Sequence, residues 1–411
     1  MIKIGLIREE KIPEDNRVAF TPSQCKSIRD NKGYSIVVQH SAHRCYKDAE
    51  YIAEGIEVKE DLSDCDILFG IKEVPKELLI PGKTYFFFSH TKKLQPYNRA
   101  LFQAICSNGI TLIDYECLEH EDGNRLLGFG FFAGVVGAHN GMMAYGNRTK
   151  EIHLDRVYKQ KNFKDLIHSY FGLKIPPVKI AVAGSGRVAH GITEIMNLME
   201  IHEVEPDEYK ETKEFAYPVY VHLKGKNLYI NKETKKYDRA EFHAFPDRYE
   251  CLFMDYFYQT DILMNGVYWQ KDVPRLFEME DLKNPDFRMH TISDISDDEN
   301  GSVPCNLGDA TIEVPVYGVN RLTGKISAPY LADSVDIMAV GNLPNELPRD
   351  ASRFFGEQLI KYIVDDLEIK SSIIEDATIT KNGQLTPAYS YMKEYATITG
   401  TITSNNNHLV V

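Results

Sequence analysis

The sequence lacks the cysteine patterns that build disulfide frameworks or zinc sites. Its seven cysteines are odd in number and widely spaced, and none stands in a CxxC arrangement. This spacing favours reduced thiols, as in proteins of reducing compartments. His40 and His43 suggest a metal pair, but no third ligand is evident, so no metal site is expected.

Long apolar runs and a surplus of basic residues are also absent. No run approaches the roughly 20 residues that a membrane-spanning helix needs, and the chain opens on an apolar strand pattern with no charged-then-apolar leader. The formal net charge is −13, whereas nucleic-acid binders present a basic face. We therefore expect a cytoplasmic protein with no nucleic-acid or membrane partner, acting on small molecules.

Length and composition predict an ordinary globular protein. The chain has 411 residues, 43% of them hydrophobic and 26% charged, which suits two domains that each bury a core. No internal repeat is evident. The oligomeric state is left open, and a homo-oligomer is one of the alternatives.

A glycine-rich stretch, KIAVAGSGRVAH at residues 179–190, has the order of a dinucleotide-binding fingerprint. Residues 180–183 suit a strand buried on both faces, and Gly184 and Gly186 follow in a tight turn. Apolar residues then recur at helical spacing from 188 to 199. A second short strand at 201–204 ends at Glu205, about 20 residues after the first glycine.

This pattern predicts which groups bind the nucleotide. Backbone N–H groups at the helix start hold a pyrophosphate, and the acid accepts hydrogen bonds from a ribose hydroxyl. Ala189 takes the third glycine position, where only close packing is required. A glycine-rich turn that binds nothing is the alternative. The expected cofactor-binding residues are Gly184, Ser185, Gly186, Arg187, Val188 and Glu205.

Three successive strands in the first 130 residues each deliver a polar residue where they end. The strands at 66–71, 84–89 and 110–115 are followed or closed by Lys72, His90 and Glu116. In open parallel sheets the ligand crevice lies outside the carboxyl ends of the strands. Taken singly, a lysine or glutamate is more often a solvated surface group, and a histidine more often one whose hydrogen bonds are satisfied in the fold. The prediction of a site therefore depends on the joint placement of the three residues.

The remaining pattern predicts how the domains are divided. Residues 129–147 read as a long buried helix that crosses from the first domain to the second. Residues 213–246 read as a charged, hairpin-like insertion. We predict an α/β protein of two Rossmann-like domains with parallel sheets and an active-site cleft between them. Residues 1–133 with about 345–411 form the substrate domain, and 134–344 form the nucleotide domain.

Several stretches outside the fingerprint carry recognisable motifs. They are IKEVP at 71–75, FSHTKKLQPYN at 88–98, DYE at 114–116, GFG at 128–130 with AG at 133–134, YW at 268–269, SDIS at 293–296 with GS at 301–302, and LPNELPR at 343–349. Together they resemble lysine-forming saccharopine dehydrogenase. The resemblance is strongest to the lysine–ketoglutarate reductase domain of aminoadipic semialdehyde synthase, and it spans almost the entire chain. The wider superfamily includes alanine dehydrogenase.

The resemblance implies an enzyme that condenses the ε-amine of lysine with 2-oxoglutarate and reduces the imine with NAD(P)H, or runs the reverse. Lys72 and His90 then correspond to the acid–base pair. Histidine titrates near neutral pH unaided, whereas a lysine does so only when burial or cations lower its pKa. Which group gives which proton is left open. The residues that correspond to substrate binders or tuning groups are Arg17, Glu73, Lys93, Glu116 and Arg125.

The sequence departs from the family pattern at two positions and leaves the cofactor open. Asp297 stands where relatives often have a cysteine, and Gly341 where several have an aspartate near the nicotinamide. Glu205 favours NAD, because a carboxylate repels a 2′-phosphate, yet Arg187 in the glycine turn keeps NADP as an alternative. Pairing with Glu14 or Asp15 is the alternative for Arg17.

Three functions remain in competition. The first is a lysine-forming saccharopine dehydrogenase, and the second is a related amino-acid or opine-type dehydrogenase such as alanine dehydrogenase. The third is a non-catalytic regulator that keeps the nucleotide fold. The sequence does not indicate the true amine and keto acid, the physiological direction or the purpose of residues 213–246.

Overall fold

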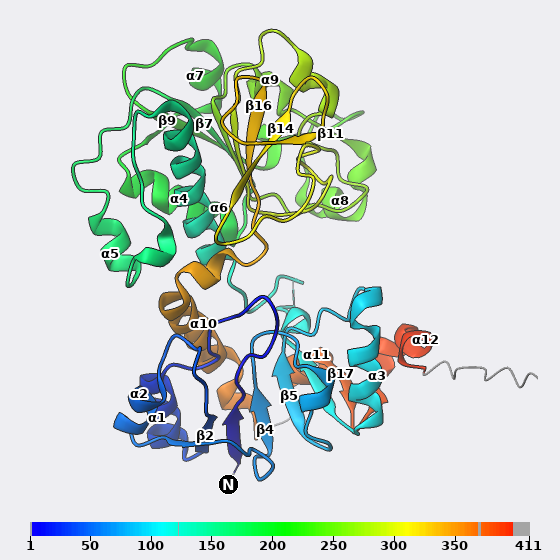
Figure 1. The fold of residues 1–411 in the computed structure, drawn as a ribbon. Coiled ribbons are helices and arrows are strands. Elements are labelled where there is room, and N and C mark those ends of the chain that lie inside the picture. The colour runs from blue at the N-terminus through cyan, green and yellow to red at the C-terminus, as the bar shows by residue number, and fades with distance from the viewer. Residues whose placement is uncertain (1, 122, 369–370, 398–411) are drawn as a thin grey trace, which may run out of the picture. The chain divides into compact units, whose positions relative to one another are not determined.

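The computed structural model describes residues 2–121, 123–368 and 371–397. The chain divides into two compact units: unit 1 comprises Met1–Gly128 and Ser352–Val411, and unit 2 comprises Phe129–Ala351. Figure 1 shows the chain's blue N-terminal strands and its red C-terminal segment within the same unit. No helix in the described ranges combines the length and apolarity that crossing a bilayer requires.

Unit 1 is built on one mostly parallel sheet. Its described strands follow the order β18-β17-β6-β5-β4-β1-β2-β3. The strands are β1 (Lys3–Leu6), β2 (Ser35–Gln39), β3 (Glu57–Lys59), β4 (Ile67–Phe69), β5 (Thr84–Phe87), β6 (Thr111–Asp114), β17 (Thr378–Lys381) and β18 (Gln384–Leu385). Its helices are α1 (Pro22–Lys32), α2 (Asp48–Ala53), α3 (Arg99–Ser107), α11 (Ser372–Ala377) and α12 (Lys393–Ala396), and α10 (Pro348–Tyr362) continues from unit 2.

Helix α1 shows how local chemistry sets an element's limits. Thr21 and Gln24 form the reciprocal capping box that satisfies the first free N–H groups, and Pro22 occupies the first turn. The helix ends at Gly33, whose φ of 72° suits a residue without a Cβ. Both signals lie in the sequence at the ends of the helix, at residues 21–24 and at residue 33.

Unit 2 holds a second sheet, whose described strands follow the order β15-β14-β16-β13-β12-β7-β9-β8. These strands are β7 (Lys179–Ala183), β8 (His202–Glu203), β9 (Val219–Leu223), β12 (Ile262–Asn265), β13 (Thr291–Asp294), β14 (Val316–Asn320), β15 (Ile326–Ser327) and β16 (Ser334–Met338). A small hairpin joins β10 (Tyr229–Asn231) to β11 (Tyr249–Cys251). The helices are α4 (Gly130–Thr149), α5 (Phe163–His168), α6 (Arg187–Leu198), α7 (Pro206–Glu211), α8 (Arg239–Ala244) and α9 (Met254–Phe257).

Helices α4 and α6 lie side by side (Figure 1), and they pack at very close range through two glycines. A Cβ on Gly134 would lie 2.0 Å from the carbonyl oxygen of Val188, and a Cβ on Gly191 would lie 2.0 Å from that of Phe131. The prediction of a buried, closely packed helix at 129–147 is confirmed. The prediction that it crosses between the domains is wrong, because this packing places the whole helix in unit 2.

One further expectation is corrected by the sheet topology. Residues 219–223 were expected within a hairpin-like insertion, but they form β9, which pairs parallel with β7 over five residues. Its apolar residues are therefore explained by burial in the main sheet, and of the strands within residues 219–251 it is β10 and β11 that pair antiparallel. Both sheets are also mixed at one edge, since β17 runs antiparallel to β6 and β14 antiparallel to β16. The predicted α/β class with two mostly parallel sheets is confirmed.

Candidate functional site

Three neighbouring strands of unit 1 bring the predicted polar residues to one edge of the sheet. Strands β4, β5 and β6 pair parallel to one another, so their carboxyl ends meet at the same rim. Lys72, His90 and Glu116 follow these strands within three residues. The topology therefore places an ammonium, an imidazole and a carboxylate along the rim where α/β sheets bind ligands.

The backbone before Lys72 is held by a carboxylate from the loop that follows β1. Glu9 accepts hydrogen bonds from the backbone N–H groups of Ile71, at 2.7 Å, and of Lys72, at 2.8 Å. Burial of the carboxyl group and the charge of Asp15 raise the pKa of Glu9 to about 8. Glu9 thus fixes the end of the strand from which the Lys72 side chain departs, and sequence reasoning missed it.

The Lys72 ammonium meets the physical condition for titrating near neutral pH. Burial, followed by the positive charges of Arg17 and Lys11, lowers its pKa to about 8, although Asp15 and Glu73 act in the opposite direction. A lysine at an exposed surface titrates near 10.4. Burial and the surrounding cations therefore lower the pKa of Lys72 by more than the two carboxylates raise it.

Arg17 forms a buried ion pair with Asp15, which is the alternative considered for it from the sequence. Its Nε lies 2.9 Å from Asp15 Oδ1, and its Nη2 lies 2.5 Å from Oδ2. Burial alone would raise the pKa of Asp15, but the Arg17 charge and hydrogen bonds hold it below its usual range. The Nε–Nη2 edge is occupied by Asp15, so Arg17 acts on Lys72 through its charge in this arrangement.

His90 is held by the carboxylate that follows Lys72 in the chain. Its Nδ1 lies 2.7 Å from Glu73 Oε1, while Glu73 Oε2 accepts from Lys11 Nζ at 2.6 Å. Burial would raise the pKa of Glu73, yet the hydrogen bond from His90, its charge and the bond from Lys11 hold it well below its usual range. An ionised Glu73, the residue next to Lys72 in the chain, therefore bridges the His90 imidazole and the Lys11 ammonium.

Two buried groups beneath His90 complete its support. Asn98 donates through Nδ2 to the carbonyl oxygen of Ser89 at 3.0 Å and to Glu73 Oε1 at 3.3 Å. Asp114 accepts from the N–H of Ser89 at 3.1 Å and also from its hydroxyl. Burial and the charge of Glu116 raise the pKa of Asp114 to about 6. These contacts fix the loop in which His90 adopts a positive φ of 49°.

The remaining predicted substrate contacts of unit 1 separate into two groups. Glu116 and Arg125 are brought together, with Arg125 Nη2 lying 3.0 Å from Glu116 Oε1. Lys93 is exposed on the loop after His90, whereas its neighbour Lys92 pairs with Glu119 at 3.0 Å. The structure thus joins two of these residues in one ion pair and leaves Lys93 at the surface.

The predicted nucleotide turn of unit 2 has the required backbone. Gly184 has a φ of 120°, and a Cβ there would lie 2.6 Å from the carbonyl oxygen of Gly266. Gly186 caps α6, and a Cβ on it would meet nothing within 4 Å, so the space beside the turn is open. Ser185 is exposed next to it, while Arg187 and Val188 open the helix. This geometry suits a pyrophosphate.

Glu205 lies farther from this turn than the fingerprint implies. It follows β8, which stands at the edge of the sheet, and β9 lies between β8 and β7. Glu205 is exposed and precedes α7, at the N-cap position. The reason is the strand order, which the spacing of motifs along a sequence does not show.

The two positions that depart from the family pattern lie side by side. A Cβ on Gly341 would lie 3.1 Å from Asp297 Oδ2 and 3.3 Å from Asp309 Oδ2. Burial and the charge of Asp309 raise the pKa of Asp297 to about 8. A third carboxylate at position 341 would add like charge to this pair, so the glycine and the aspartates are compatible with one another.

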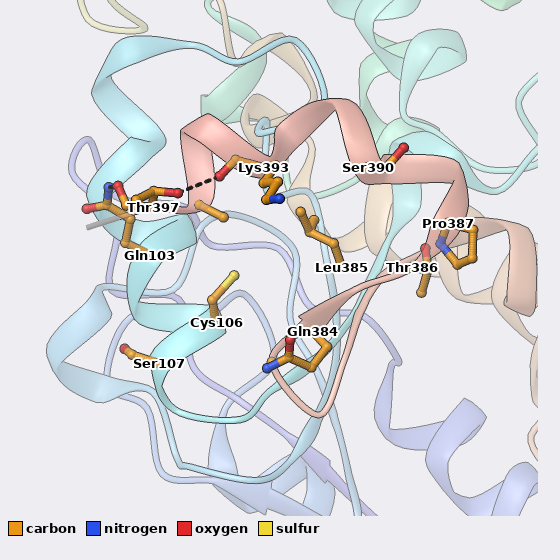
Figure 2. Close-up of a pocket in the computed structure, with 12 residues that line it drawn as sticks. Gln103, Cys106, Ser107, Gln384, Leu385, Thr386, Pro387, Ser390, Lys393 and Thr397 are labelled. Atoms are coloured by element: carbon orange, nitrogen blue, oxygen red, sulfur yellow. Dashed lines mark hydrogen bonds between the residues drawn. The ribbon is translucent and has the colours of Figure 1, made fainter. Parts of the chain in front are cut away.

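The two histidines considered as a metal pair, and one surface pocket, lie apart from the predicted site residues. His40 contacts Asp48, and His43 Nδ1 lies 3.4 Å from Glu14. No group of three or more His, Cys, Asp or Glu in the described ranges is arranged to hold a metal. A surface pocket of about 670 Å³ lies at the β18 edge of unit 1. Figure 2 shows residues that line it, among them Cys106 and Lys393. None of the predicted site residues lines it.

Comparison with known proteins gives matches over nearly the whole chain. The family described as alanine dehydrogenase/PNT, N-terminal domain, matches residues 5–136. Mitochondrial alpha-aminoadipic semialdehyde synthase of Rattus norvegicus is 30% identical over 95% of this chain and 47% of its own length. The chain thus spans about half the length of that relative.

A shorter relative and a solved structure match along almost their entire lengths. The saccharopine dehydrogenase [NAD(+), L-lysine-forming] of Emericella nidulans is 25% identical over 92% of this chain and 94% of its own length. A solved L-alanine dehydrogenase superposes with a TM-score of 0.66 at 16% identity, covering 96% of this chain and 100% of that one. The last comparison establishes the shared fold.

Proposed function

We propose that this chain, which belongs to the lysine-forming saccharopine dehydrogenase and lysine–ketoglutarate reductase family within the alanine dehydrogenase superfamily, is an NAD(P)H-dependent oxidoreductase. It condenses the ε-amine of L-lysine with the ketone of 2-oxoglutarate to form saccharopine, or catalyses the reverse. The observation that carries the proposal is that Lys72 and His90 follow two neighbouring parallel strands of unit 1. Burial also lowers the pKa of Lys72 to about 8, which suits proton transfer near neutral pH.

The reaction divides into proton transfers and one reduction. Attack by the neutral amine on the ketone gives a carbinolamine, which loses water to form an imine. The leaving water must receive a proton and the attacking amine must lose one. Lys72 and His90 supply and accept these protons, while Glu73 orients the imidazole through its 2.7 Å contact.

The nucleotide turn supports the reductive half of the proposal. The open space beside Gly186 and the backbone N–H groups of the first turn of α6 suit the pyrophosphate of a nicotinamide dinucleotide. When bound, that cofactor supplies the hydride that reduces the imine carbon. Gly184, Ser185, Gly186, Arg187 and Val188 would hold it.

The substrates carry carboxylates, and unit 1 offers cations for them. We propose Lys93 and Arg125 as contacts for these anions. The Glu116 carboxylate partly offsets the positive charge of Arg125 through their ion pair, and Asp15 does the same for Arg17. Carboxylate recognition by guanidinium or ammonium groups is charge-assisted and strong where solvent is excluded.

The proposal is tested by incubating the protein with lysine, 2-oxoglutarate and either NADH or NADPH. Saccharopine formation, measured by mass spectrometry, is expected to accompany oxidation of the nicotinamide. Ammonia with pyruvate is the matched substrate control, and faster turnover of that pair would favour an alanine dehydrogenase activity instead. Tight cofactor binding without turnover on any amine and keto-acid pair would favour a regulatory protein.

A further inference from the structure

The strand beside the glycine strand is not the one that follows the glycine helix. In the usual dinucleotide fold, the strand after that helix lies next to the glycine strand, and the residue at its end contacts the adenosine ribose. Here β9 pairs with β7 over residues 219–223, and among the strands that the structure describes β8 pairs with β9 alone. The position beside the turn therefore belongs to the residue that follows β9.

The register identifies that residue as Lys224. Leu223 pairs with Ala183, and the Gly184 N–H donates to the carbonyl oxygen of Leu223 at 3.0 Å. Lys224 is thus one strand spacing from the turn. Because Glu203 pairs with Tyr220, Glu205 is level with residue 222 and two spacings, about 10 Å, from β7.

The Lys224 ammonium is held close to the turn by a histidine. His222 Nε2 lies 2.8 Å from the carbonyl oxygen of Gly184, so this nitrogen donates and Nδ1 is left as the acceptor. Lys224 Nζ lies 3.4 Å from that Nδ1. Burial lowers the pKa of His222, which favours the neutral ring that this arrangement needs.

The side chains at the end of β9 face the helix that begins at the turn. The Tyr220 hydroxyl lies 3.2 Å from Asn197 Oδ1 of α6, which identifies the covered face of the strand. Residues 222 and 224 share that face, because side chains alternate along a strand. The nearby Glu203 carboxylate accepts from Tyr220 at 3.0 Å. Lys224 itself is exposed and accessible to a ligand.

From this arrangement we infer that the chain selects NADP(H) over NAD(H), with the Lys224 ammonium binding the 2′-phosphate and His222 positioning it. A 2′-phosphate carries about two negative charges and strong acceptor oxygens, as phosphate monoesters do. A cation at the ribose position stabilises it, whereas the carboxylate of an NAD-type site repels it. The inference rests on the proposed function, since it assumes a dinucleotide at the Gly184–Val188 turn.

The test is equilibrium binding of NADPH and of NADH to the full chain, by calorimetry and without substrates. We expect the wild type to bind NADPH at least about tenfold more tightly, the effect of one hydrogen bond between charged groups. Lys224→Ala should lose about 10- to 100-fold in NADPH affinity and leave NADH within about twofold. Lys224→Arg should keep the preference.

Two matched variants separate this inference from its competitors. Glu205→Gln should leave both affinities unchanged, whereas a ribose-binding Glu205 would make NADH weaker and NADPH tighter in that variant. Lys235→Ala removes a positive charge that pairs with Glu250 at 2.8 Å on the small hairpin, and it should change neither affinity. Unfolding midpoints confirm that each variant is folded.

Three results would overturn the inference. A wild type that prefers NADH, or equal losses for both nucleotides in Lys224→Ala, would reject it and leave the proposed function standing. Failure of the folded wild type to bind either nucleotide would reject both together.

Discussion

The two candidate sites depend on different features of the chain, charged side chains in unit 1 and backbone conformation in unit 2. In unit 1 the rim of the sheet carries charged side chains, and their burial, followed by the charges around them, shifts the pKa values of Lys72 and Glu9 to about 8. In unit 2 the turn after β7 relies on backbone shape, with a positive φ at Gly184 and open space at Gly186. Substitutions at the unit 1 rim should therefore change the pH dependence of activity through their charge. Substitutions in the glycine turn should change stability and nucleotide binding through steric clashes.

The largest expected effect on stability comes from Gly184→Ala. The new Cβ would lie 2.6 Å from the carbonyl oxygen of Gly266, and the φ of 120° is costly for any L-residue with a side chain. We expect the free energy of unfolding to fall by at least about 2 kcal/mol, with loss of nucleotide binding. Denaturant titration and calorimetry measure the two effects.

Gly186→Ala is the control within the same turn. A Cβ there meets nothing within 4 Å, so the stability should change by less than about 1 kcal/mol. The methyl group would instead occupy the space intended for the pyrophosphate and weaken nucleotide binding. Equal destabilisation by both variants would contradict this difference between the two glycines.

A pair of charge variants in unit 1 should move the pH profile in opposite directions. Glu73 raises the pKa of Lys72 and Lys11 lowers it, so Glu73→Gln should shift the pKa below about 8 and Lys11→Gln above it. Glu73→Gln should also lower kcat/KM by about 10- to 100-fold, because the imidazole loses an ionised partner. The pH dependence of kcat/KM reports both shifts, and parallel shifts would refute the assigned charges.

Asp297 should make stability depend on pH in a defined direction. Burial and Asp309 raise its folded pKa to about 8, whereas an unfolded aspartate titrates near 3.9. The proton held by the folded state stabilises it at low pH, and this contribution is lost as the pH rises from about 4 to 8. Asp297→Asn should therefore gain roughly 1–3 kcal/mol over the wild type at pH 8 and little at pH 4.

The exposed Glu299 is the matched control for this prediction, and Glu299→Gln should change stability little at either pH. Urea titrations of the three proteins at both pH values give the comparison. A wild type whose stability rises from pH 4 to pH 8, with no gain from Asp297→Asn, would show that the carboxyl group is not desolvated.

The smallest effect is expected for Lys93→Ala. Lys93 is exposed, so an ion pair with a substrate carboxylate would be screened by water. We expect KM for 2-oxoglutarate to rise about two- to fivefold with kcat unchanged. Lys76→Ala removes a similar exposed cation and should leave KM as it is, and an unchanged KM in Lys93→Ala would remove this residue from the substrate site.

Features that depend on local sequence could be predicted. The capping box and the terminal glycine of α1 satisfy backbone groups within a few residues, so its limits follow from the sequence. The meeting of Lys72, His90 and Glu116 at one rim follows because consecutive strands pair in order. The glycine turn is likewise encoded by adjacent residues.

Features that depend on non-local pairing could not be predicted. The strand following α6 is displaced to the sheet edge by β9, and no local pattern distinguishes that order from the usual one. Glu9 and Asn98 support the acid–base residues through contacts with backbone 9 to 63 residues away along the chain. The buried pairing of Arg17 with Asp15 was one of two alternatives, and only the fold chooses between them.

The most direct test of the proposed chemistry is Lys72→Met, assayed for turnover of lysine, 2-oxoglutarate and reduced nicotinamide cofactor alongside cofactor affinity. We predict that turnover falls by about 10²- to 10⁴-fold, the range for loss of a general acid–base group, while the dissociation constant of the cofactor stays within about twofold of the wild type. A variant that keeps more than about a tenth of wild-type turnover would contradict the assignment of Lys72 to proton transfer.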